Sequence, residues 1–317
     1  MTASNHEPAA AVAAEAVVQT STAKPEPDPT TLIAVTRPPR SFRAVLRTLM
    51  RNKLGVTGAS ILVALVLFCF VGPLVYRTNQ TDVDLLNAAL PPGDGYPLGT
   101  DSNGFDVLGR MMLGGQVSLQ IGLLAALVAT VVGTIYGAIA GLVGGVLDGF
   151  MMRVVDTLLA IPFMFFVLIL SARFTATPVS LALVIGGFSW LVIARLIRSE
   201  VLSLRVREFV LAARLMGAKN RRLIFTHLIP NTVGVIVVNV TFQVADAILT
   251  IAALGFLGFG LTYPVTDWGS QLSAGVTFIA SDYWWLIYPV GACIVLTVLA
   301  LNLLGDALRD ALDRRGE

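Results

Sequence analysis

Long stretches without charged residues dominate this sequence and constrain its fold more than any other feature. A helix needs about 20 apolar residues to cross the hydrocarbon core of a membrane. Six stretches reach or approach this length, over 54–76, 117–147, 157–172, 174–194, 232–256 and 284–305. The third is short, and the fifth contains a single acid, Asp246. We therefore predict an all-α, polytopic membrane protein with six transmembrane helices.

Composition supports this class and excludes several others. Only 13% of the residues are charged, against about 25% in soluble domains, so a soluble enzyme with a hydrated surface is excluded. The net charge of +2 and the absence of a basic stripe interleaved with aromatic residues argue against nucleic-acid binding. Cys69 and Cys293 both lie in apolar stretches, and no Cys/His cluster indicates a metal site.

The first 40 residues differ from the rest of the chain. They are rich in Ala, Pro, Thr and Glu and show no amphipathic period, which predicts a disordered arm over 1–40. They also lack the basic start and apolar core of a cleavable signal peptide. The six-span domain is expected over 41–317.

The basic residues predict the orientation in the membrane, because Lys and Arg accumulate in short cytoplasmic segments. With six spans, all but three of the 22 Lys and Arg residues fall on the side of the two termini. The exceptions are Arg77, Arg110 and Arg173. Both termini are therefore placed in the cytoplasm.

No motif for catalysis is present. No lysine follows the glycine of a phosphate-binding loop, the two histidines form no HExxH pair, and no serine stands in GxSxG. We therefore expect neither nucleotide hydrolysis nor a resident cofactor in this chain.

The cytoplasmic connection over about 195–230 has helical periodicity without enough apolar length to span a membrane. An apolar face with small residues at its centre consists of Phe209, Ala212, Ala213 and Met216, and a mostly basic face of Arg207, Leu211 and Arg214. Gly217 is expected to end this helix, and Pro230 a second short helical stretch. Small central side chains would let another protein approach the backbone closely. The arginines would equally suit a helix lying in the lipid headgroup layer.

At this connection the sequence resembles a known family. Ala212, Ala213, Gly217 and 228–231 resemble the signature loop of permease subunits of ATP-driven, binding-protein-dependent importers. Further stretches resemble the C-type subunit of the oligopeptide, dipeptide and nickel branch: 97–119, Asp156 to Pro162, 254–260, Asp267 to Gly269, and 296–315. Together they extend over about 41–315.

The resemblance implies the type I ABC importer permease fold in the inner (plasma) membrane. It implies a homologous second permease subunit as heterodimer partner, two ATPase subunits that hold ATP and Mg, an extracytoplasmic substrate-binding protein, and a peptide-like substrate. It places a coupling helix near 207–217 and assigns ATPase docking to Glu208, Ala212, Ala213, Arg214 and Gly217.

The sequence departs from the family pattern at three positions. Leu211 stands where the family has an acid before the two alanines, Phe105 replaces an outer-loop arginine, and Ile251 replaces a common glutamate. An acid at 211 could pair with Arg207 (i−4) and Arg214 (i+3). Its absence leaves both arginines free, and we hypothesise that they meet acidic groups on the ATPase.

Two features within the spans complete the predictions. Asp246 is an acid inside a span, where a charge costs about 2.5 to 3.5 kcal/mol. It is a candidate for the substrate path, with structural pairing to the partner subunit or a misplaced span boundary as alternatives. Glycines four residues apart at Gly133, Gly137 and Gly141 predict close helix packing.

The sequence leaves the substrate open among dipeptides, longer peptides, glutathione-like compounds and nickel chelates. A carrier driven by an ion gradient, and a membrane-bound scaffold or receptor, are the alternatives of other classes. An ion-driven carrier usually has several ionisable groups within the membrane and an internal repeat, and Asp246 alone is a plausible ion-coupling group here.

Overall fold

The computed structural model describes residues 48–313, except 79, 81, 94, 174 and 175. The following concerns the unit 42–317. The arm predicted over 1–40 lies outside the described residues. The helices are α3 (Lys53–Phe70), α4 (Gly72–Val75), η2 (Leu85–Asn87), α5 (Val107–Val143), α6 (Gly145–Leu159), α7 (Phe163–Ser171), α8 (Pro178–Leu204), α9 (Glu208–Leu215), α10 (Asn220–Arg222), η3 (Leu223–Leu228), α11 (Ile229–Phe256), α12 (Trp268–Val276), η4 (Ile279–Ser281), η5 (Trp284–Leu286) and α13 (Tyr288–Asp313). No strand occurs in the described part.

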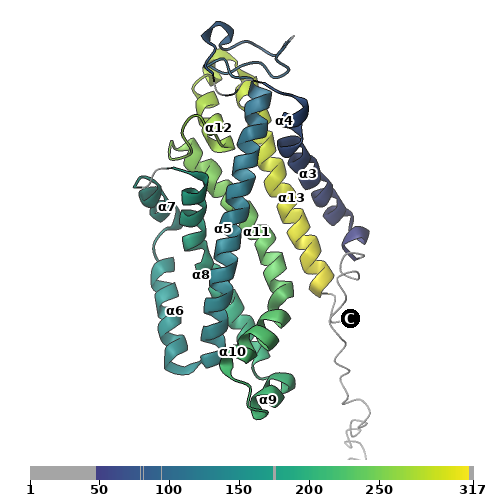
Figure 1. The fold of residues 1–317 in the computed structure, drawn as a ribbon, viewed down its shortest axis with the longest axis vertical. Helices are drawn as coiled ribbons and strands as arrows, with labels where there is room; N and C mark the ends of the chain where they lie inside the picture. The colour runs from purple at the N-terminus through teal and green to yellow at the C-terminus, as the bar shows by residue number, and fades with distance from the viewer. Residues whose placement is uncertain (1–47, 79, 81, 94, 174–175, 314–317) are drawn as a thin grey trace, which may run out of the picture. The chain divides into compact units, whose positions relative to one another are not determined.

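The long helices run side by side as a bundle (Figure 1). Five segments are long and apolar enough to cross a membrane: Lys53–Val75, Val107–Val143, Pro178–Leu204, Asn220–Phe256 and Trp284–Leu312. Helices α6 and α7 together pass the same test but meet at a 75° bend, so they form one broken span if they are counted as a sixth. The prediction of an all-α polytopic membrane protein is confirmed.

Several predicted span boundaries are wrong by about ten residues. The second span begins at Val107 rather than 117, the third begins at Gly145 as α6, and α8 runs on to Leu204. The predicted boundaries followed uncharged stretches, whereas these helices carry charged residues, several of which are paired with neighbouring helices or loops. The Arg198 guanidinium donates to both oxygens of Asp148, at 2.5 and 2.7 Å, and Arg195 pairs with Asp156.

These two ion pairs join α6 to α8 in different surroundings and predict different losses on mutation. The side chains of Asp148 and Arg198 are 11% and 31% exposed, whereas those of Asp156 and Arg195 are about half exposed. Asp148→Ala leaves a partly buried cation unpaired, for which we expect a loss of about 3 kcal/mol in the free energy of unfolding. Asp156→Ala is expected to lose less than about 1 kcal/mol. Denaturant unfolding of the two variants in detergent measures both, and equal losses would contradict this ranking.

The predicted glycine seam is confirmed, and its partner is α8. A side chain on Gly133 would collide with Ile193, and one on Gly141 with Val201. A side chain on Gly137 would meet the backbone of Ala194. The seam therefore lets α5 and α8 approach closely, and this pair forms the most extensive helix contact in the described chain.

The prediction that Pro230 ends a short helical stretch is wrong. Pro230 lies in the first turn of α11, directly after the π-helical turn η3, and such turns are places where the regular hydrogen-bond ladder is interrupted. Upstream, η3 is a π-helical turn, so helical structure continues from Asn220 to Phe256. Helix α9 is thus separated from this long helix by only a few residues.

At the end of the bundle opposite α9, hydrogen bonds to the Asp106 carboxylate connect the end of α4 with the start of α5. The Asp106 carboxylate caps α5 by accepting from the Gly109 amide at 2.8 Å and from the Tyr76 hydroxyl at 2.6 Å. Burial, followed by this hydrogen bond, raises the pKa of Tyr76 above its ordinary value. Tyr76 therefore remains a neutral donor that ties the end of α4 to the start of α5.

Candidate functional site: a short helix at one end of the bundle

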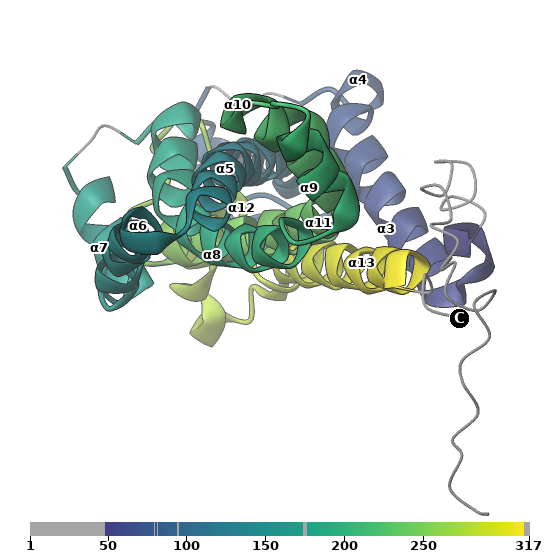
Figure 2. The ribbon, with the colours of Figure 1, turned by 90° about the horizontal axis from the view of Figure 1, so that it is seen from below.

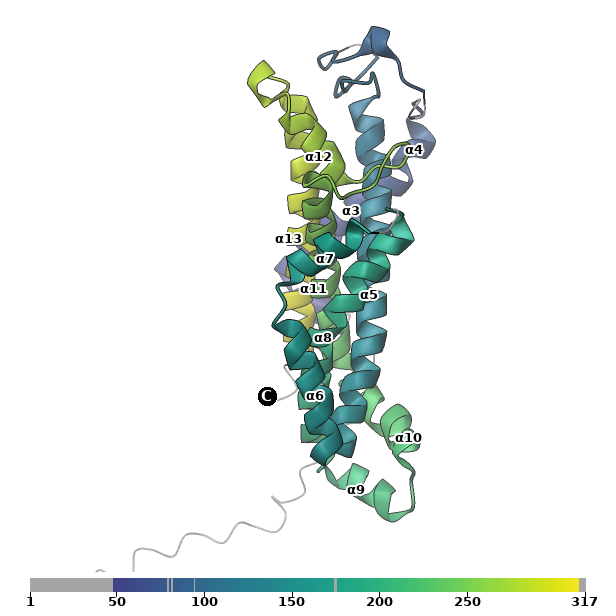
Figure 3. The same cartoon turned by 90° about the vertical axis from the view of Figure 1, so that its left-hand side faces the viewer.

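Helix α9 lies across the end of the bundle, as the view from below shows (Figure 2). Seen from the side, α9 and α10 project at the opposite end from α12 (Figure 3). The connection that carries α9 runs from about 205 to 219, shorter than the predicted 195–230, because α8 extends to Leu204. A rigid helix at this place is exposed to any protein that binds this end.

Two buried side chains, Val210 and Ala213, pack α9 against the bundle; we call this buried contact the α9 seat. Val210 is fully buried and Ala213 is 5% exposed. Both belong to an apolar cluster that includes Leu223 and Leu228 of η3 and Val201 of α8. Movement of α9 would therefore be transmitted to α8 and to the start of the long Asn220–Phe256 helix.

The other face of α9 presents apolar side chains to the surroundings. Leu215 and Met216 are 89% and 83% exposed, and Phe209 and Leu211 are about half as exposed. Exposed contiguous apolar groups on a helix are typical of a protein or membrane interaction site. The sequence pattern assigned Met216 and Phe209 to this face but did not single out Leu215.

The predicted site residues around α9 do not all lie on one face. Ala212 is exposed, whereas Ala213 points into the seat. The apolar face predicted to contain both alanines is therefore divided, and Ala213 reaches a partner only through the position of the helix. The physical reason is that η3 and α8, which are distant in sequence, cover the Val210 and Ala213 side.

The charged residues assigned to docking lie at the two ends of α9. Arg207 is the residue before the first turn, Glu208 opens it, and Arg214 lies in the last turn. Glu208 and Arg214 complement the helix dipole, which favours acids at the start and cations at the end, whereas Arg207 does not. All three side chains are exposed, and no ion pair of Arg207 or Arg214 is found within the described part of the chain.

Gly217 ends α9 as predicted. Its φ of +82° lies in the left-handed region that favours glycine. The Gly217 amide donates to the Arg214 carbonyl at 3.0 Å, and the Ala218 amide to the Ala213 carbonyl at 3.0 Å. These bonds satisfy the last carbonyls of the helix and turn the chain toward α10.

A basic hollow of about 450 Å³ adjoins the start of the long helix, lined by Lys219, Arg221, Arg222, Phe225 and Thr226. The three cations are exposed. The sequence showed this cluster only as part of a basic connection. With Arg207 and Arg214 it makes this end of the bundle positively charged.

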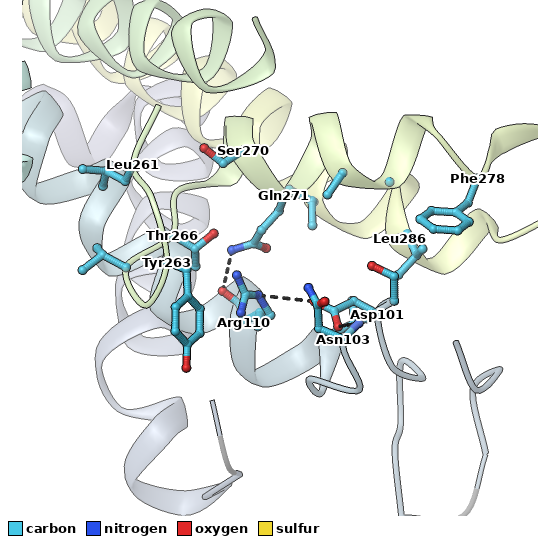
Figure 4. A pocket seen from close by; sticks show the side chains of 16 residues that line it. Asp101, Asn103, Arg110, Leu261, Tyr263, Thr266, Ser270, Gln271, Phe278 and Leu286 are labelled. Atoms are coloured by element: carbon cyan, nitrogen blue, oxygen red, sulfur yellow. Dashed lines mark hydrogen bonds and ion pairs between the residues drawn. The ribbon is translucent and has the colours of Figure 1, made fainter. Parts of the chain in front are cut away.

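A second pocket, of about 130 Å³, lies at the end opposite α9, between the start of α5, the 261–266 loop and α12 (Figure 4). Arg110 forms part of its wall, with an ion pair to Asp101 at 3.6 Å and its guanidinium 4.6 Å from the centre of the Phe105 ring. The carbonyl of Arg110 accepts from Gln271 at 2.7 Å. Phe105, the departure from the family pattern, is buried here and stacks with Tyr263.

Asp246 is exposed on α11 and lines neither of these pockets. The Thr250 hydroxyl donates to the Asp246 backbone carbonyl at 2.7 Å. No ion pair of the Asp246 carboxylate is found among the described residues. Nor does any group of three or more His, Cys, Asp or Glu residues in the described part of the chain have the arrangement of a metal site.

The comparisons with known proteins match this architecture. Residues 133–316 match the family model described as "Binding-protein-dependent transport system inner membrane component", which covers more than half of the chain. The chain belongs to this permease family. Residues 41–92 also match the N-terminal TM domain of oligopeptide transport permease C.

Individual relatives cover most of this permease. It is 39% identical to the oligopeptide transport system permease protein OppC of Escherichia coli K12. The 269 aligned residues are 84% of this chain and 89% of that protein. OppC of Bacillus subtilis is 37% identical over 262 residues, 83% of this chain and 86% of that protein. The dipeptide transport system permease protein DppC of Alkalihalophilus pseudofirmus is 35% identical over 272 residues, which are 86% of this chain and 89% of that protein.

Membership of this family relates the features at both ends of the bundle to membrane transport. The permease is a transport subunit of the membrane, and its fold is that of type I importers. The end with α9 holds an exposed helix on a buried seat, and the end with α12 holds a pocket lined partly by polar side chains.

Proposed function

We propose that this permease forms half of a heterodimeric pore that imports di- and oligopeptides, with a homologous permease as the other half. The peptide substrate is supported by the names of the relatives, which include oligopeptide and dipeptide permeases at 35–39% identity. Import is powered by two ATPase subunits, which supply ATP and Mg. An extracytoplasmic binding protein delivers the peptide.

The observation that carries the proposal is the divided surface of α9. Its seat on η3 and α8 fixes the helix to the spans, and its outward side offers Leu215 and Met216 to a partner. An ATPase that binds this side can push or pull the helix as a rigid lever. The start of the Asn220–Phe256 segment then moves with α9, which suits alternating access by rigid-body motion.

The charge distribution supports an orientation with α9 in the cytoplasm. Arg205, Arg207, Arg214, Lys219, Arg221 and Arg222 lie in or next to the α9 connection. Lys and Arg are enriched in short cytoplasmic segments of membrane proteins. In this orientation both termini lie in the cytoplasm, and the Arg110 pocket faces the binding protein.

Leu215→Glu is the direct test of α9 as the ATPase docking site. A carboxylate in an apolar contact must be desolvated, so we expect a loss of at least about 2 kcal/mol in ATPase affinity. Co-purification of the ATPase subunits in mild detergent measures it. Leu86→Glu is the matched control, because Leu86 is 95% exposed in the short helix η2 at the other end. Equal ATPase recovery in both variants would contradict the assignment.

The two free arginines give a separate prediction. If Arg207 and Arg214 meet acidic groups on the ATPase, the double variant Arg207→Ala/Arg214→Ala should bind it about tenfold more weakly at low salt and lose much of this difference at high salt. Titration of ATPase subunits onto the reconstituted permease at two ionic strengths measures this. Unchanged affinity and transport would show that the arginines serve another purpose, such as contact with lipid headgroups.

ATP dependence separates the proposal from an ion-driven carrier. Vesicles containing both permeases and the ATPases should accumulate peptide from the binding protein only with ATP inside the cytoplasmic compartment. Uptake driven by an ion gradient without the ATPases would support the carrier instead.

A further inference from the structure

Asp246 lies on a sector of α11 that the rest of the described chain leaves uncovered. The opposite side of the helix packs against α5, where a side chain on Gly122 would collide with Ile248. One flank packs against α13 through Thr241 and Phe242 at Gly305. The other flank joins the apolar cluster of α7 and α8 through Ile251. Asp246 points between these two flanks, away from α5.

Two amide side chains share this sector. Asn239 and Gln243 precede Asp246 by seven and three residues, which places all three near one face of the helix; we call Asn239, Gln243 and Asp246 the Asp246 stripe. The two amides are half-buried. The Asn239 amide nitrogen donates to the Val235 carbonyl at 2.8 Å.

The Asp246 stripe offers hydrogen-bond acceptors, and no Lys or Arg among the described residues forms an ion pair with it. Two partly buried pairs elsewhere are formed within the chain: Asp148 with Arg198, and Arg110 of α5 with Asp101 of the preceding loop. Asp246 has no such ion-pair partner among the described residues. A carboxylate within the membrane requires either a cation or a water-filled path. A position facing hydrocarbon is therefore unfavourable for an ionised Asp246.

We propose that the Asp246 stripe binds the ammonium group of the translocating substrate, an inference that rests on the proposed peptide-import function. The two carboxylate oxygens of Asp246 and the amide oxygen of Gln243, about one turn away, offer acceptors for the donors of an –NH₃⁺ group. Asn239 lies about 10.5 Å farther along the helix. Opposite charge favours the amino end of a peptide over its carboxyl end. The stripe thus sets which end of the peptide contacts this permease during passage.

The test compares two peptides with two permeases in reconstituted vesicles containing the whole transporter. The peptides differ only in a free or an acetylated amino group, and are chosen so that the isolated binding protein retains both. Asp246→Asn is expected to reduce uptake of the free peptide at least about tenfold, as for loss of a desolvated charge pair. Uptake of the acetylated peptide should change less than about twofold. Asp246→Glu should restore the preference for the free amine.

Other outcomes overturn the inference. An equal loss for both peptides, accompanied by loss of the second permease on purification, means that Asp246 pairs with that subunit. An equal loss with an intact complex assigns Asp246 to structure alone. No change in either uptake removes Asp246 from the path. If the wild-type transporter accumulates neither peptide with ATP, the proposed function itself fails, which is a distinguishable result.

Cysteine labelling tests water access to the stripe without relying on transport rates. The two native cysteines, Cys69 and Cys293, are buried, so the background is low. Asp246→Cys should react with a charged, membrane-impermeant thiol reagent, and a free-amine peptide should slow the reaction. Leu127→Cys is the matched control on α5, where Leu127 is 57% exposed but flanked by apolar side chains. An unreactive Asp246→Cys, or equal rates at both positions, would overturn the inference.

Discussion

Gly217→Pro is expected to abolish substrate-stimulated ATP hydrolysis in the assembled transporter while the permease still inserts into the membrane. Proline fixes φ near −65°, whereas Gly217 has φ of +82°. Proline also removes the N–H that donates to the Arg214 carbonyl. In addition, Met216 has ψ of 8°, a conformation disfavoured before proline. The end of α9 therefore cannot keep its structure.

A graded series and a matched control define this result. Gly217→Ala meets only the left-handed backbone penalty of about 1–2 kcal/mol and should reduce stimulated hydrolysis partially. Gly258 has a similar φ of +86° and lies near the end of α11 away from α9. Gly258→Pro should therefore retain the ATPases on purification. Normal ATPase recovery and stimulation in Gly217→Pro would refute α9 as the coupling element.

Tryptophan substitutions at the two alanines separate contact from seating. Ala213 is 5% exposed in the α9 seat, so Ala213→Trp should displace the whole helix at a cost of about 1–3 kcal/mol. Ala212 is exposed, so Ala212→Trp should leave α9 seated and obstruct only a bound partner. Protease sensitivity of the purified permease alone should rise for the first variant and not for the second.

The sequence was sufficient for features that depend on local chemistry. Uncharged length predicted the spans, spacing predicted the glycine seam, and Gly217 predicted the end of α9. Each of these follows from a property that a residue carries into any fold: no charge, no side chain, or access to positive φ. The resemblance to importer permeases then supplied the fold class, which the family match confirms.

Features that depend on distant neighbours were missed. The outward and inward sides of α9 could not be distinguished, because η3 and α8 decide which side is covered. The span boundaries were misplaced because Asp148 and Arg198 neutralise each other across two helices. A charge counts against a span only when it is unpaired, and pairing is a property of the packed structure.

Trp268→Ala is expected to cause the largest loss of stability among single substitutions at the α12 end. Trp268 is 1% exposed. It lies in an apolar cluster that joins four helices through Leu65 of α3, Met111 of α5 and Val290 of α13. Truncating a buried tryptophan to alanine costs about 3–5 kcal/mol, because the surroundings do not fill the space.

Hydrogen bonds add to this loss. The Trp268 indole N–H donates to the Met111 carbonyl at 2.9 Å, and its backbone N–H to the Ser118 hydroxyl at 3.2 Å. Alanine keeps the second bond and removes the first. Trp268→Phe removes the same bond but retains most of the ring, so it should cost only about 1–2 kcal/mol.

Thermal unfolding of the detergent-solubilised permease measures the difference. At about 2–4 °C per kcal/mol for a domain of roughly this size, Trp268→Ala should lower the midpoint by about 6–20 °C, and Trp268→Phe by a few degrees. Equal shifts would assign the contribution of Trp268 to its hydrogen bond rather than to packing. A larger shift for alanine would mean that packing of the Trp268 ring holds α12 in place. The ring fills the space beside Gly115, and a side chain on Gly115 would collide with the indole. The α12 end is then fixed by shape, whereas α9 at the other end keeps an apolar face open for a partner.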